Sequence, residues 1–441
     1  MALPRSTQIA ILAAALAALG VRIGAAQGGL WLDEAWSAVF ARDAGTAIGV
    51  LRIGHDNNHV LNSWWIQLVG WPASPLAMRA LSIVSGTAAV PVAAAIAARR
   101  SPLGAALAAW LFALSPILIT YGSEARGYAP MLLALLSAIL MIGRSLDAPS
   151  RPVPTIGIAL AFGIGTLAQL TMLFALPALL GWVLWARRSP AATFRLLGPG
   201  LLAAGAAAAA TLAGGMTIGS YSPFTVDAWF DALGELVRYT LAIGWLPKPL
   251  LPIVTAIGIF ALVIARAADH RAVLIALAVI AFPLAVAMLG VGNSGLARYY
   301  LIAAAVLLLA IADAPRAAAL PIAIVVLAGS VLGDLDLIRN QRGNPAAAIR
   351  AMKQTHPQGG TYAVEAERDA AVIDVAAAQA RYPARLIESL CPAADFLFVA
   401  RDGSAPFPDR PARCGGDYRM VAGADTTGLS GNHWRLYLRA R

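Results

Sequence analysis

The sequence predicts a mainly α-helical, polytopic membrane protein with a small soluble α/β domain at its C-terminus. Of its 441 residues, 59% are hydrophobic and 13% are charged, with a mean hydropathy of +0.71, whereas about a quarter of the residues of a soluble domain are charged. Residues 339–441 hold 24 of the 56 charged side chains, and the other 338 residues hold 32. This composition excludes a single soluble fold, intrinsic disorder and a collagen-like repeat.

Eleven apolar stretches are candidates for membrane-spanning helices. A spanning helix needs about 20 mostly apolar residues, since each residue adds about 1.5 Å across a hydrocarbon core of about 30 Å. The stretches are residues 7–26, 78–98, 103–121, 128–146, 155–169, 171–186, 196–215, 249–265, 272–290, 299–313 and 318–334. We interpret the first as a retained span rather than a cleaved signal peptide. We therefore predict about eleven spans within residues 1–338.

Basic residues in the short loops orient these spans, because Lys and Arg are enriched in cytoplasmic loops. One side receives Arg5, Arg99, Arg100, Arg144, Arg151, Arg187, Arg188, Arg195, Arg266, Arg271 and Arg316. The other side receives the loops 27–77 and 216–248 and residues 339–441. We predict a bacterial inner-membrane protein whose outer loops and C-terminal domain lie in the periplasm. Much of the net charge of +10 is this cytoplasmic bias, so no nucleic-acid partner is predicted.

Residues 339–441 show the pattern of a small α/β domain. After a polar linker at 339–345, helical patterns at 346–354 and 370–381 alternate with strand-like runs at 361–364, 395–400 and 434–438. The only two cysteines, Cys391 and Cys414, lie here, and an oxidising compartment would let them form a disulfide. Two free thiols are the alternative. The absence of a phosphate-binding loop motif or a dense metal-ligand motif favours a cap or scaffold.

The first outer loop contains two polar clusters that could carry chemistry. Adjacent carboxylates, Asp33 and Glu34, follow the first span directly, and Asp33 is alternatively an N-cap for the helix after it. Further along lie His55, Asp56, Asn58 and His59. These side chains suit a sugar, a phosphate or a divalent ion. Because His-x-x-x-His spacing alone is a weak signal, no metal ligands are predicted.

Two further clusters lie on the same predicted face. Glu124, Arg126 and Tyr128 join the third and fourth spans, where a structural ion pair is the alternative. Arg298 and Tyr299 open the tenth span and suit a phosphate at headgroup level, or ordinary snorkelling of an interfacial arginine. The loop 216–248 is predicted to be amphipathic or re-entrant, and Lys248 in it is a candidate phosphate contact.

The motifs in these clusters resemble the C-type glycosyltransferase superfamily. The specific branch is the bacterial one related to protein O-mannosyltransferases, lipid A aminoarabinose transferases and rhizobial lipopolysaccharide-core galacturonosyltransferases. The resemblance covers about residues 1–335 in topology, and relatives often have prolines where this chain has His59-Val60. The motifs are Asp33-Glu34, Asn58-His59-Val60-Leu61, Glu124-Ala125-Arg126-Gly127-Tyr128 and Arg298-Tyr299.

The resemblance implies a polyprenyl-phosphate sugar donor and inverting transfer to a hydroxyl group on the extracytoplasmic face. The acceptor is a glycolipid, a polysaccharide or a protein of the cell envelope. Asp33 would be the general base, and Arg126, Arg298 and Lys248 would stabilise the leaving phosphate. No cofactor is implied, and a divalent cation is a less favoured alternative. The remaining predicted substrate-binding residues are Glu34, His55, Asp56, Asn58, His59, Glu124, Tyr128 and Tyr299.

Two other classes of function remain open from the sequence. A lipid-linked sugar transporter or flippase would share the helix bundle, but it should have ionisable residues through the middle of several spans. A non-catalytic envelope assembly protein would use the C-terminal domain as its working part and leave Asp33 dispensable.

Overall fold

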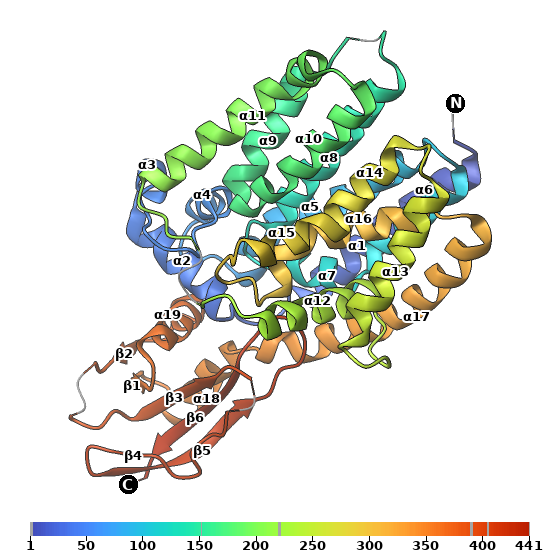
Figure 1. Ribbon diagram of the computed structural model, residues 1–441. Coiled ribbons are helices and arrows are strands. Elements are labelled where there is room, and N and C mark those ends of the chain that lie inside the picture. Colours follow the sequence, from blue (N-terminus) through green and yellow to red (C-terminus); the bar gives the residue numbers. More distant parts are fainter. Residues whose placement is uncertain (1–2, 151, 219–221, 389–390, 404, 441) are drawn as a thin grey trace.

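The structure, a computed structural model, describes residues 3–150, 152–218, 222–388, 391–403 and 405–440. Helices form an elongated bundle, and a small sheet lies at one end of it (Figure 1). The bundle helices are α1 (Arg5–Ala25), α5 (Pro75–Ala97), α6 (Pro102–Leu114), α7 (Pro116–Gly122), α8 (Tyr128–Asp147), α9 (Thr155–Ala168), α10 (Ala175–Arg187), α11 (Pro190–Ala213), α12 (Val226–Leu241), α13 (Leu250–Ala265), α14 (His270–Ala276), α15 (Phe282–Met288), α16 (Leu301–Asp313) and α17 (Arg316–Asn340).

Seven helices in the described residues are long and apolar enough to cross a membrane. An eighth span results if α6 and α7, which meet at a 57° bend, cross together. Helices of this length and apolar character are typical of a membrane protein. Each of the eleven predicted stretches is largely helical, but eleven spans are not confirmed, because α9, α13 and α16 have only 14, 16 and 13 residues against the roughly 20 that a span needs.

Helix α16 lies in the middle of the bundle. Its residues 301–312 are all buried, and it packs against α5, α6, α8, α12, α14 and α17. A helix that is apolar on every side is stable only when other elements surround it. The short 3₁₀ helix η3 (Ala297–Tyr300) leads directly into α16. The bundle core therefore holds Arg298 in place from one side.

The loops predicted to be cytoplasmic meet at one end of the bundle. Arg99 pairs with Asp147, Arg100 pairs with Asp269, and the Arg271 guanidinium lies 3.3 Å from Asp147. The N-terminus lies at this end, and the sheet lies at the opposite end (Figure 1). The predicted sorting of loops thus corresponds to two ends of the molecule. Which end faces the cytoplasm stays a prediction.

The first outer loop contributes three helices: α2 (Leu32–Ala44), α3 (Ala47–Val50) and α4 (Val60–Val69). The C-terminal region contributes α18 (Ala346–Thr355), α19 (Ala370–Gln379) and a six-stranded sheet in the order β2-β1-β3-β6-β5-β4. Strand β1 is parallel to β2 and β3, and the other pairs are antiparallel. The strands are β1 (Gly360–Val364), β2 (Ala384–Leu386), β3 (Phe396–Arg401), β4 (Ala412–Arg413), β5 (Gly416–Ala424) and β6 (His433–Arg439).

The predicted runs at 361–364, 395–400 and 434–438 correspond to β1, β3 and β6, whereas β2, β4 and β5 were not predicted. Strand β5 buries only Tyr418 of its nine residues, so it lacks the alternating apolar pattern that signals a half-buried strand. Cys391 and Cys414 form a disulfide with Cα atoms 5.4 Å apart. It ties the segment before β3 to the turn between β4 and β5.

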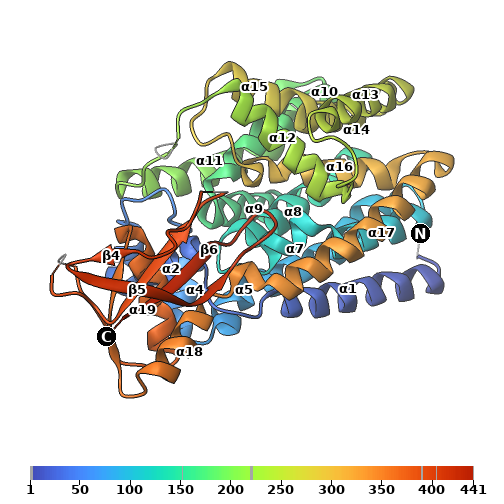
Figure 2. The same cartoon turned by 90° about the horizontal axis from the view of Figure 1, so that it is seen from below.

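The C-terminal region packs directly on α2. One hydrophobic core includes Trp31 and Ala35 of the first outer loop together with Ile373 of α19 and Trp434 of β6. Figure 2 shows α2, α18 and α19 close together beside the sheet. The Leu32 backbone N–H also donates to Asn432 Oδ1 at 3.1 Å. The sheet and its helices therefore hold the start of α2 in position, which is the role of a scaffold.

Replacing Trp434 tests this packing. Trp434 is 1% exposed, stacks on Phe398 and donates from Nε1 to the Gly343 carbonyl oxygen at 2.7 Å. Trp434→Ala should lower the free energy of unfolding by about 3–5 kcal/mol, measured as a fall in the melting temperature of the detergent-solubilised protein. Met420→Ala, on neighbouring β5 and 57% exposed, is the control and should melt like the wild type. Equal melting of both variants would contradict this account.

Candidate active site

Asp33 lies in the first turn of α2, at the edge of the helix bundle. Its Oδ2 atom is 2.9 Å from Arg126 Nη1 and accepts a hydrogen bond from Arg298 Nη1 at 3.0 Å. The alternative that Asp33 caps α2 is wrong, because the N-cap is Trp31, whose backbone N–H donates to Glu34. The side chain of Asp33 thus contacts two guanidinium groups from distant parts of the chain.

Arg126 is fixed by partners on three of its nitrogen atoms. Besides the ion pair with Asp33, Nη2 donates to Asn57 Oδ1 at 2.8 Å and Nε donates to His59 Nε2 at 3.1 Å. The guanidinium carbon lies 5.0 Å from the centre of the Tyr128 ring, within cation–π range. Arg126 is buried between the turn before α8 and the first outer loop. The predicted residues His59 and Tyr128 therefore position Arg126.

His59 accepts a hydrogen bond from Arg126 because it is neutral. The side chain is 1% exposed, and burial together with the nearby Arg126 and Arg298 charges holds the pKa of His59 well below its ordinary value. A neutral imidazole has one nitrogen that accepts. Protonation would place a third positive charge beside the two arginines and remove this acceptor.

Arg298 comes from η3 and completes the cluster. Its guanidinium carbon lies 5.7 Å from the centre of the Tyr299 ring, and Nε is buried with no hydrogen-bond partner among the described residues. Two guanidinium groups face the single carboxylate of Asp33, so this cluster has an excess positive charge. The planar guanidinium group of arginine binds phosphate well, because two of its N–H groups can donate to two phosphate oxygens at once. An arginine with a donor left unpaired is suited to bind an anion here.

Glu34 is part of the scaffold, which corrects the prediction that it binds substrate. It is fully buried, and its two oxygens accept from Arg79 at 2.7 and 2.5 Å. The backbone N–H of Ala125 donates to the same carboxylate at 2.7 Å. Glu34 thus ties α2 to the turn that carries Arg126, and no part of it is exposed to a ligand.

Glu124 requires the same correction. It is fully buried, its Oε1 lies 3.4 Å from Arg342 Nε, and burial raises its pKa. Arg342 also donates to the Ala25 carbonyl oxygen at 2.6 Å and to Ser123 Oγ at 2.7 Å. This ion pair joins the turn before α8 to the linker before α18. Its role is structural, but the partner differs from the one that the sequence suggested, because Arg126 pairs with Asp33 and Glu124 pairs with Arg342.

The polar cluster at residues 55–59 divides between scaffold and cavity. Asn58 is buried and donates to the Val50 carbonyl oxygen at 2.9 Å, so it shapes the loop. His55 lies between the rings of Trp36 and Phe40 and pairs with Asp56 at 3.0 Å. That hydrogen bond from His55 lowers the pKa of Asp56. Of these three predicted residues, Asp56 alone lines a cavity.

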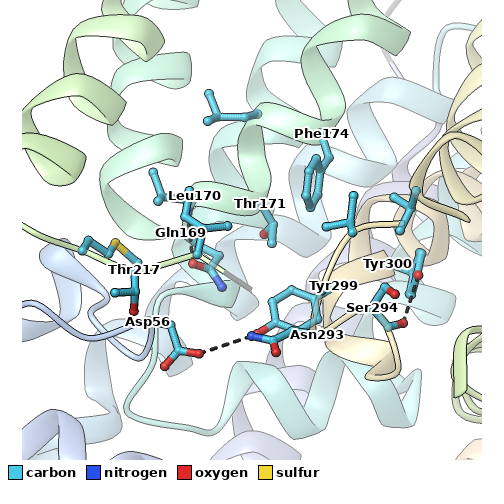
Figure 3. A pocket seen from close by; sticks show the side chains of 16 residues that line it. Asp56, Gln169, Leu170, Thr171, Phe174, Thr217, Asn293, Ser294, Tyr299 and Tyr300 are labelled. Atoms are coloured by element: carbon cyan, nitrogen blue, oxygen red, sulfur yellow. Dashed lines mark hydrogen bonds between the residues drawn. The ribbon is translucent and has the colours of Figure 1, made fainter. Parts of the chain in front are cut away.

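This cavity has a volume of about 120 Å³ and lies between the first outer loop, the break between α9 and α10, and the segment before α16 (Figure 3). Asp56 and Tyr299 are the predicted residues that line it. Gln169, Thr171 and Asn293 also line it and were not predicted as site residues. Polar residues within or next to apolar stretches were the available signal for them. Asn293 donates from Nδ2 to Asp56 Oδ2 at 3.2 Å.

Lys248 lies in a different environment from the other predicted residues. Its Nζ is 2.5 Å from Asp231 and 3.7 Å from Glu235, both on α12. The amphipathic character predicted for the loop 216–248 belongs to this helix. A lysine already neutralised by two carboxylates is a weak phosphate ligand, so the structure does not support a phosphate contact for Lys248. No group of three or more His, Cys, Asp or Glu side chains in the described ranges could hold a metal ion.

Acidification should expose the requirement for a neutral His59. Between its depressed folded pKa and its unfolded value of about 6.5, the unfolded chain binds the extra proton, so stability falls as the pH drops below about 6.5. One such group contributes at most about 1.4 kcal/mol per pH unit. His59→Gln keeps an acceptor for Arg126 and should show a shallower loss of melting temperature between pH 7.5 and 5.5. Parallel profiles for the two proteins would rule out this role.

The chain matches no protein-family model and has no significant match among curated proteins. The resemblance to C-type glycosyltransferases therefore depends on the motifs and on the site geometry described above.

Proposed function

We propose that this protein is a membrane glycosyltransferase that moves a sugar from a polyprenyl-phosphate donor to a hydroxyl group of a cell-envelope acceptor. The observation that carries the proposal is the contact of Asp33 with both Arg126 and Arg298. It brings the proposed base and the two proposed phosphate-binding groups together at the end of a membrane bundle. We further propose that this end faces the periplasm of a bacterial inner membrane.

Each group has a defined part in the proposed reaction. The acceptor oxygen attacks the anomeric carbon as the bond from that carbon to the phosphate oxygen breaks, and the hydroxyl proton passes to Asp33. The electron pair of the broken bond leaves with the polyprenyl phosphate. Because a phosphate is an acidic leaving group, it needs charge stabilisation rather than a strong general acid. Arg126 and Arg298 supply that stabilisation.

The contacts of Asp33 suggest how donor binding activates the base. Both arginines contact the same Oδ2 atom in the free protein, so Asp33 is engaged in two ion pairs. A donor phosphate competes for the same guanidinium donors and draws them from Asp33. The carboxylate is then released from these ion pairs and can accept the hydroxyl proton of the acceptor. This arrangement fits direct displacement with inversion.

The buried charges give the transporter alternative less support than they give the transferase proposal. Arg22, Arg79 and Arg342 are buried, but they donate to backbone carbonyl oxygens near the ends of helices. Such contacts satisfy helix termini and do not form a polar path along the bundle axis. The cation cluster lies at one end of the bundle, as a one-sided reaction requires.

Replacing the proposed base is the direct test. Asp33→Asn should reduce release of polyprenyl phosphate from polyprenyl-phosphate sugars by about 10²–10⁴-fold while the protein stays folded, because the amide cannot accept the proton. Asp43→Asn, an exposed position on the same helix, is the matched control and should retain full turnover. Near-normal turnover by Asp33→Asn, with an unchanged melting temperature, would remove Asp33 as the base.

Arg298 is expected to act through donor binding. Arg298→Ala should raise the apparent KM for the donor by about 10–100-fold, the loss expected for one charged hydrogen bond. Arg298→Lys should recover part of this loss, because lysine keeps the charge but not the fork. The measurement is donor titration with the acceptor saturating. Unchanged KM in Arg298→Ala would exclude a phosphate contact.

A further inference from the structure

The cavity lined by Asp56 and Tyr299 contains hydrogen-bonding groups that the protein itself leaves without partners. Thr171 is 6% exposed and Ser294 is 3% exposed, and the hydroxyl oxygens of both are buried with no hydrogen-bond partner among the described residues. Both residues line the cavity (Figure 3). Native proteins rarely bury hydroxyl groups unpaired, because desolvation without a partner is costly. The ligand of this cavity should therefore offer hydrogen-bonding groups to these two hydroxyls, although most of the lining is apolar.

The charge of the lining restricts the ligand further. In the described part of the chain, Asp56 is the only ionisable acid or base among Asp, Glu, Lys, Arg and His that lines the cavity. It holds a negative charge near neutral pH, because the hydrogen bond from His55 lowers its pKa. His55, which pairs with Asp56, and Arg298, whose charge acts on it, both lie outside that lining. The cavity thus favours hydroxyl or ammonium groups, which donate hydrogen bonds to a carboxylate, and repels a second carboxylate.

Position points to the sugar of the donor. The cavity of about 120 Å³ is smaller than the roughly 150 Å³ that accommodates benzene, so it is too small to enclose a long prenyl chain and takes at most part of one sugar ring. Phe174 and Tyr300 supply aromatic surface in the lining, against which the C–H faces of a sugar can pack. Tyr299 lines the cavity and stacks against Arg298, which contacts Asp33. A ring held here lies next to the proposed phosphate site.

We propose that this cavity binds the sugar of the donor and that Asp56, Thr171 and Ser294 select neutral or amino sugars over uronic acids. This inference rests on the proposed transferase function and adds the chemical class of the sugar. Asn293 supports the selection, because its Nδ2 holds Asp56 Oδ2 while its backbone N–H donates to the Ser222 carbonyl oxygen at 2.9 Å. Asn293 thereby joins two outer loops at the cavity and orients the carboxylate.

The test compares matched donors that differ only at the C6 carbon of the sugar. Polyprenyl-phosphate glucose and polyprenyl-phosphate glucuronic acid are incubated with the full-length protein, with a 6-amino-6-deoxyglucose donor as a third arm. Released polyprenyl phosphate is measured. The neutral and amino donors should be used at least about tenfold more efficiently than the uronate, the size expected for one charged hydrogen bond. Equal or better use of the uronate would overturn the inference.

Variants assign the selection to the cavity. Asp56→Asn should bring the ratio of kcat/KM for the amino and uronate donors close to one, whereas Asp227→Asn, an exposed position on α12, should leave the ratio unchanged. Thr171→Val replaces an unpaired hydroxyl by a methyl group of similar shape. It should raise KM for all three donors and leave melting unchanged. If the ratio of kcat/KM for the amino and uronate donors is unaltered in Asp56→Asn, the carboxylate of Asp56 does not discriminate between the sugars.

The measurements distinguish a failure of this inference from a failure of the proposed transferase function. If any donor releases polyprenyl phosphate in an Asp33-dependent manner, the transferase function stands, whichever sugar is preferred. If no donor does, binding of the same three donors to Asp33→Asn still reports on the cavity, because that variant keeps it. Tight binding of the uronate by this variant would count against the selection independently of activity.

Discussion

The burial of Arg126 is the constraint on which the site depends. A guanidinium group removed from water at the edge of a membrane bundle must be paired, because its desolvation costs several kcal/mol. Arg126 meets this requirement with Asp33, Asn57 and His59. All three come from the first outer loop, so the pairing fixes that loop against the turn before α8. The proposed base takes its position from this charge compensation.

The buried arginines fall into two groups that differ in their partners. Arg22, Arg79 and Arg342 donate to backbone carbonyl oxygens, and Arg79 and Arg342 also pair with the buried carboxylates of Glu34 and Glu124. The oxygens of Ala25 and Ala26, at the C-terminal end of α1, lack partners within the helix and carry its partial negative charge. Arg126 and Arg298 instead contact side chains around Asp33. The first group stabilises the junction of the bundle with the outer loops, and the second leaves charge available for a ligand.

The C-terminal region has a mechanical connection to the site. Its hydrophobic core is continuous with α2, and Arg342 links the linker before α18 to Glu124. A shift of this region would therefore move Asp33 relative to Arg126. Scaffolding of a site by a second layer of contacts is a common requirement for catalysis, since reacting groups must be held within fractions of an ångström. This connection explains why a soluble region packs so closely on a membrane bundle.

The sequence by itself determined the helical membrane character, the separation of charge between the two ends and most of the chemical groups of the site. These follow from local patterns, because apolar length and loop charge depend on neighbouring residues. The tertiary structure decided which charges are scaffold and which belong to the candidate site. Glu34 and Glu124 stand beside site residues in sequence but point to Arg79 and Arg342, while Asn57, Thr171 and Asn293 enter the site from separate segments. Side-chain direction and long-range pairing are not encoded in spacing along the chain, so only the folded bundle could reveal them.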